Sequence, residues 1–140
     1  MLLKQEGGAV FSVDLSTREG DGHVLVALRG ELDLLDAAGV AGALAAVTAR
    51  KPRVIVDLAG LDFIDARGLA ALVSGWKHAR RAGGDLLLAA PQPRVLRVLA
   101  ATRLCDLFSV HPSVEEAVSS AGSWRRVAAP VASPVVLAAP

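Results

Sequence analysis

The chain has 140 residues, of which 53% are hydrophobic and 21% are charged. A formal net charge of +1 argues against the basic surface of nucleic-acid-binding proteins, and a single cysteine excludes an internal disulfide. We expect one domain over residues 10–121, preceded by an extension at 1–9 and followed by a flexible tail rich in proline, alanine and valine at 122–140. No export signal or membrane span is evident, which favours a cytoplasmic protein without membrane insertion.

Two stretches near the start predict a β-hairpin. They cover residues 10–16 and 24–28, and the glycines at 20 and 22 supply the positive φ angles of a tight turn. A helix is expected over residues 35–50, where Val40, Leu44 and Val47 recur with helical spacing. Asp33 can cap its first turn. Residues 53–58 are rich in β-branched side chains and predict a central strand.

The helix predicted over residues 67–82 has the clearest periodicity of the chain. One of its faces carries large apolar side chains, at Leu69, Leu72, Val73 and Trp76. We therefore expect Trp76 to be buried. The rest predicts a strand at 85–90, a helix at 91–104, a short strand at 107–110 and a last helix at 112–121. This order predicts an α/β domain with a mixed sheet of about five strands and about four helices.

Candidate catalytic residues are scarce. The three histidines lie in three separate predicted elements, so no neighbour in sequence would orient any of them. Asp57, Asp62 and Asp65 gather after the central strand, where open α/β sheets form their sites. They would suit a phosphoryl-accepting receiver domain or a minor enzyme. The receiver's late lysine is missing, because the only lysines stand at 4, 51 and 77. We therefore expect no enzyme, no metal site and no cofactor.

Several segments resemble the STAS domain family. They read Gly-Glu-Leu-Asp at 30–33, Val-Ile-Val-Asp-Leu at 54–58 and Leu-Asp-Phe-Ile-Asp-Ala-Arg-Gly-Leu at 61–69, with a further matching segment at 76–85. The resemblance covers roughly residues 10–121. Gly-Glu-Leu-Asp alone is a weak motif. Its spacing ahead of Phe-Ile-Asp-x-x-Gly-Leu, with matching elements between, is specific.

The resemblance implies a bacterial protein-binding module of the anti-sigma-factor antagonist type. Such antagonists act in transcription regulation by partner switching: they bind an anti-sigma factor with a kinase-like ATPase fold and so free a sigma factor. The anti-sigma factor can phosphorylate a serine at the start of the second main helix. Here the position after Asp65 is Ala66, and a methyl group cannot accept phosphate. The resemblance therefore implies a binding protein without phosphorylation control at this position.

The resemblance also implies a partner-binding face around this helix start, at Asp33, Asp65, Ala66, Arg67, Ala70 and Ser74. We expect Ala71 on the same exposed side, where small residues leave room for another protein. Arg67 stands where the helix dipole disfavours a cation, so either a local acid such as Asp62 neutralises it or it awaits an acidic partner. Asp33 can serve as a helix cap, as a partner contact, or as both.

Two further points stay open on the sequence alone. In an alternative function the same helix start would sense a small anionic ligand, a nucleotide or a lipid, with Arg67 as the anion contact. A homodimer is also compatible with the sequence. The three phenylalanines sit in apolar stretches and are expected in the core, which leaves no exposed aromatic rings for stacking on nucleic-acid bases.

Overall fold

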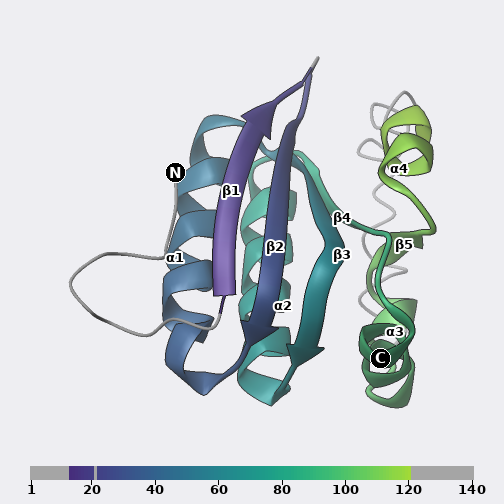
Figure 1. The fold of residues 1–140 in the computed structure, drawn as a ribbon. Helices are drawn as coiled ribbons and strands as arrows, with labels where there is room; N and C mark the ends of the chain where they lie inside the picture. The colour runs from purple at the N-terminus through teal and green to yellow at the C-terminus, as the bar shows by residue number, and fades with distance from the viewer. Residues whose placement is uncertain (1–12, 21, 121–140) are drawn as a thin grey trace.

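The computed structural model describes residues 13–20 and 22–120. Within them, five strands form one sheet in the order β1-β2-β3-β4-β5 (Figure 1). The strands are β1 (Val13–Glu19), β2 (Val24–Leu32), β3 (Arg53–Ile64), β4 (Asp85–Ala89) and β5 (Ser109–His111). The helices are α1 (Leu34–Arg50), α2 (Ala66–Arg81), α3 (Pro93–Ala101) and α4 (Val114–Ser120), with a 3-10 turn, η1 (Leu104–Asp106). The predicted fold class is confirmed.

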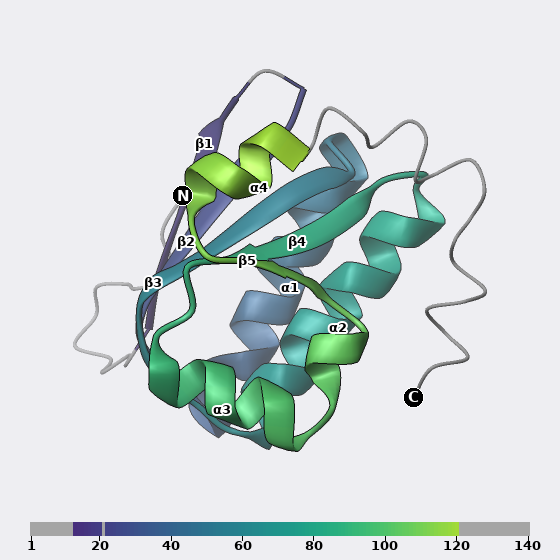
Figure 2. The ribbon, with the colours of Figure 1, turned by 90° about the vertical axis from the view of Figure 1, so that its right-hand side faces the viewer.

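The connections decide which helix covers which face of the sheet. β1 and β2 form the predicted antiparallel hairpin, and β2 to β5 run parallel to one another. Because the parallel strands follow one another in space as in sequence, right-handed crossovers place α1, α2 and α3 on the same side. α4 packs on the opposite face of the sheet (Figure 2). There Ala117 belongs to a small second core with Ile55 and Leu87.

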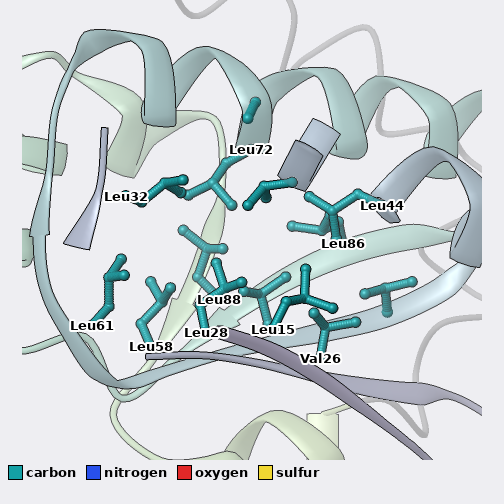
Figure 3. Close-up of a cluster of buried hydrophobic side chains, with 14 of the residues drawn as sticks. Leu15, Val26, Leu28, Leu32, Leu44, Leu58, Leu61, Leu72, Leu86 and Leu88 are labelled. Atoms are coloured by element: carbon teal, nitrogen blue, oxygen red, sulfur yellow. The ribbon is translucent and has the colours of Figure 1, made fainter. Parts of the chain in front are cut away.

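The main core lies between the sheet and its helices. Figure 3 shows Leu15, Leu28, Leu58 and Leu88 from the strands alongside Leu44 and Leu72 from α1 and α2. Trp76 is only 4% exposed and belongs to this core, as its position on the apolar stripe of α2 predicts. The helix therefore has a firmly anchored inner face, which fixes the direction of its outer face.

β2 and β3 extend beyond the residues that the sequence assigns to them. β3 was expected to end at residue 58, but its pairing with β2 continues until Leu32 lies beside Ile64. The pairing shifts register twice, and Gly30 takes a positive φ of 98° at the second shift. The local Ala-Gly pair at 59–60 resembles a turn, but tertiary pairing overrides it. As a result both strands end side by side, immediately before α1 and α2.

The helix after β4 is shorter than expected. α3 begins at Pro93, and the chain leaves helical geometry at Arg103, whose φ is 65°. This left-handed residue starts η1 and brings Leu104 toward α2. The proposed extension at 1–9, the first three hairpin residues and the proposed tail at 122–140 lie outside the described residues. No helix in the described ranges has the length and hydrophobicity needed to cross a membrane.

Candidate functional site

One carboxylate joins the starts of α1 and α2. Asp65 is the N-cap of α2, and its Oδ1 accepts a hydrogen bond from the Gly68 N–H at 3.0 Å. Its Oδ2 accepts from the Leu34 N–H, at the start of α1, at 3.1 Å. The Asp65 N–H in turn donates to the Leu32 carbonyl at 3.1 Å. These bonds hold the two helix starts together as one rigid unit.

The two sequence motifs acquire a physical meaning in this unit. Asp33 caps α1, as expected, because its Oδ1 accepts from the Leu35 N–H at 3.1 Å. Gly68 is required for close packing, since a Cβ there would lie 2.8 Å from both the Leu32 carbonyl oxygen and the Ile64 side chain. Phe-Ile-Asp-x-x-Gly-Leu thus encodes a cap followed by a close approach between helix and strand ends.

Ala66 and Arg67 occupy the exposed first turn of α2. Ala66 is the first residue of the helix, and its side chain is a single methyl group. The acid expected to neutralise Arg67 is engaged elsewhere, because Asp62 Oδ1 accepts from the Gln92 side-chain amide at 3.2 Å. Arg67 makes no ion pair within the described part of the chain. Its guanidinium therefore remains available to an acidic group from outside.

A groove runs along the outer face of α2. It has a volume of about 480 Å³ and lies between α2 and Leu104 of η1. The small residues Ala66, Ala70 and Ser74 line it, so they lie on the exposed side of the helix on which the sequence analysis placed them. Ala71 does not belong to this face: it is only 3% exposed. The prediction for Ala71 is wrong because α1 packs along α2 and covers that side.

Exposed apolar side chains surround the same helix starts. Leu34 is 57% exposed, Leu35 is 77% exposed and Phe63, just before Asp65, is 41% exposed. The expectation that Phe63 is a core residue is therefore wrong, since β3 ends with this side chain facing outward. A signal for the leucines was present in the sequence. The stripe Val40, Leu44, Val47 extends back to positions 36 and 37, which leaves 34 and 35 off the buried face.

The three carboxylates considered for a receiver or an enzyme do not form one site. Asp57 lies within β3 rather than at its end, and its Oδ1 accepts from the Ala59 N–H at 3.0 Å. Asp62 accepts from Gln92, and Asp65 caps α2. Among the described residues no group of three or more histidines, cysteines, aspartates and glutamates could hold a metal ion. Each carboxylate instead accepts hydrogen bonds from different partners.

The perturbed titratable groups lie away from the start of α2. Burial raises the pKa of Asp85, although the Leu86 N–H and Arg80 act in the opposite direction. Its carboxylate pairs with Arg80 at 3.5 Å, next to Trp76 at the other end of α2. Burial also raises the pKa of Cys105, which favours the thiol form. Asp85 and Cys105 are thus explained by packing.

Comparison with known proteins identifies the domain. The STAS domain model matches residues 14–117. The anti-sigma-F factor antagonist RsfA of Mycobacterium tuberculosis is 35% identical over 104 residues, which cover 71% of this chain and 80% of that protein.

Solved structures agree on the fold. An anti-sigma factor antagonist from Mycobacterium paratuberculosis superposes with a TM-score of 0.70 at 23% identity, over 79% of this chain and 95% of the other. The phosphorylated form of the Bacillus cell fate determinant SpoIIAA gives a TM-score of 0.60 at 18% identity, over 75% of this chain and 96% of the other. At these identities the two structures show the shared fold alone. The family model and the RsfA match go further: the chain belongs to the STAS domain family.

Proposed function

We propose that the chain is a non-catalytic regulator that binds an anti-sigma factor with a kinase-like ATPase fold in the bacterial cytoplasm. The docking site is the unit formed by the starts of α1 and α2, with Asp33, Asp65, Ala66, Arg67, Ala70 and Ser74 as contact residues. The observation that carries the proposal is the exposed apolar cluster of Leu34, Leu35 and Phe63 around a rigid, doubly capped helix start. The relationship to an anti-sigma-F factor antagonist supports it.

The physical properties of this surface suit a protein partner. Apolar side chains give binding energy when they are desolvated, and small neighbours allow another backbone to approach closely. The hydrogen bonds of Asp65 fix the geometry before binding, which reduces the entropy lost on association. Arg67 supplies a charge that an acidic group of the partner would neutralise.

We further propose that this docking site is not controlled by phosphorylation at its first helical residue. Ala66 offers no oxygen for phosphoryl transfer. A regulator with this residue would bind its partner constitutively at this site. Its activity would then be set by its abundance, by a competing antagonist or by a ligand.

The test is a binding measurement with a matched control. The full chain serves as bait in its native cell, and the kinase-fold ATPase identified by mass spectrometry is purified for titration. Ala66→Arg should weaken binding by about tenfold or more, because a long cation would fill the docking space. Ala49→Arg, on an exposed position near the opposite end of α1, should bind as wild type does. If Ala66→Arg binds with the same affinity as wild type and Ala49→Arg, the start of α2 is not the interface.

A thermal-shift series separates this function from the sensing of a small anion. Nucleotides and anionic lipids should leave the melting temperature of the full chain unchanged, because the proposed site binds protein. A ligand-dependent rise that Arg67→Ala abolishes would favour the anionic-ligand function instead.

A further inference from the structure

The side chains that line the groove along α2 change from small to basic toward the C-terminal end of the helix. Beyond Ser74 its lining passes to Lys77, His78 and Arg81, and no acidic side chain of the described residues lines it. Lys77 and Arg81 are exposed, and neither makes an ion pair within the described ranges. The part of the groove near the C-terminal end of α2 is therefore positively charged, and no acidic side chain of the described residues lines it.

The helix dipole accounts for cations near a C-terminus but not for their direction. Arg80 lies in the same last turn and is already engaged, with its guanidinium 5.5 Å from the Trp76 ring centroid and paired with Asp85. Lys77, His78 and Arg81 instead line the groove. η1 carries one carboxylate, Asp106, which pairs with Arg103 at 3.4 Å and does not line the groove. Within the described residues, neither Lys77 nor Arg81 is therefore paired with the acid of η1.

The groove also has an apolar wall. Val73 from α2 and Leu104 from η1 are half-buried and line it from its two sides. A segment that fits must carry an apolar side chain for this wall and carboxylates for the cationic end. The residues at 121–140 do not match this chemistry, because they include Arg125 and Arg126 and no aspartate or glutamate.

We propose that the groove between α2 and Leu104 binds an acidic amphipathic segment of the partner protein. An apolar side chain of that segment packs between Val73 and Leu104, and its carboxylates pair with Lys77 and Arg81 and accept a hydrogen bond from His78. The identification of the segment's owner as a kinase-fold regulator rests on the proposed function. The chemistry of the segment follows from the groove itself.

The test uses a defined probe rather than the regulator. The full-length chain, labelled with nitrogen-15, is titrated at about 150 mM salt with a synthetic helical peptide of leucine, alanine and glutamate, arranged as one apolar and one acidic face. A second peptide with lysine in place of every glutamate is the control. The acidic peptide should shift the amide resonances of the second half of α2 and of Leu104. The basic peptide should leave them in place.

Charge reversal sharpens the result. Lys77→Glu combined with Arg81→Glu should lower the affinity for the acidic peptide by about tenfold, because two attractive charge pairs become repulsive. Arg18→Glu with Arg97→Glu makes the same charge change at exposed positions outside the groove and should alter the affinity by less than about twofold. If the double reversal fails to fold, Lys77→Gln with Arg81→Gln should give a smaller loss in the same direction.

Several results would overturn the proposal: no binding of the acidic peptide, equal binding of the basic one, shifts confined to other elements, or equal losses in both charge-reversed proteins. Deleting residues 122–140 tests the remaining occupant. If the groove resonances move on deletion and the acidic peptide binds only the shortened chain, the chain's own segment occupies the groove. The peptide titration does not involve the regulator, so a failure of the proposed function would appear separately, as wild-type affinity of Ala66→Arg.

Discussion

The two faces of α2 contrast sharply in what they carry. The inner face buries Leu72 and Trp76 to 0% and 4% exposure, whereas the outer face presents Ala66 and Ala70. The helix thus holds the fold with its large side chains and carries small side chains on its exposed face. It follows that substitutions on the inner face should change stability, and those on the outer face should change binding without unfolding the domain.

The largest effect should come from the inner face. Trp76→Ala should lower the free energy of unfolding by about 3–5 kcal/mol, as deletions of large buried aromatics do. Lys77→Ala, the next residue on the exposed face, should change it by less than about 0.5 kcal/mol. Urea denaturation measures both. A loss below about 1 kcal/mol for Trp76→Ala would mean that the face described as buried does not hold the fold.

Two glycines provide a second test of the same contrast. Gly68→Ala should destabilise the domain by about 1–3 kcal/mol, because the new methyl would press on the Leu32 carbonyl and the Ile64 side chain. Gly42→Ala, on the exposed side of α1 with no atom near the added methyl, should stabilise it by about 0.4–1 kcal/mol. Thermal unfolding of the two variants should thus shift in opposite directions. A shift in the same direction would contradict the close packing at Gly68.

The outer face should respond in binding alone. Ala70→Arg and Ser74→Arg should each lower the affinity for the proposed regulator by about tenfold, because the new side chains fill the groove. Their free energies of unfolding should stay within about 0.5 kcal/mol of wild type. Isothermal titration and urea denaturation of the same samples separate the two effects. Wild-type affinity in both variants would exclude this face as the interface.

The two helix caps should differ in strength. Asp65 accepts bonds from two helix starts and Asp33 from one, so Asp65→Ala should cost about 1–2 kcal/mol and Asp33→Ala about 1 kcal/mol or less. Equal losses would show that the Leu34 contact adds nothing. Urea denaturation of both variants at the same pH measures the two losses. Because each variant replaces one aspartate by alanine, the difference between them reports the different hydrogen bonds.

Features encoded by local pattern could be predicted from the sequence. The cap at Asp33 follows from residue type and position, and the burial of Trp76 follows from helical spacing. The extension of β3 to Ile64 could not be predicted in this way, because it depends on pairing with β2 rather than on the turn-like residues at 59–60.

The candidate site was predictable only in part, for the same reason. Ala66 and Ala70 lie on the expected face, whereas Ala71 is covered by a neighbouring helix that the sequence does not place. The groove needs Leu104, which a left-handed residue at Arg103 brings near α2. The exposure of Leu34, Leu35 and Phe63 depends on where two strands end together. These features arise from tertiary structure, which local periodicity does not report.

Whether the proposed docking site can be phosphorylated is the central question for the proposed function. Ala66→Ser places a hydroxyl at the first residue of α2 and is the matched control for the wild-type chain. If the variant accepts phosphate from the regulator and loses affinity, the site keeps the geometry of a phosphorylation switch and lacks only its oxygen. If it does not, Arg67 or other contacts prevent transfer even with the hydroxyl present.

The most direct measurement is the affinity of the wild-type chain for the proposed kinase-fold regulator with and without ATP turnover, combined with mass spectrometry of the recovered chain. If Ala66 prevents phosphorylation of the proposed docking site, we expect no phosphate between residues 65 and 72 and the same dissociation constant in both conditions. Phosphate on Ser74, accompanied by release of the regulator, would contradict constitutive binding and show that the switch has moved along the helix.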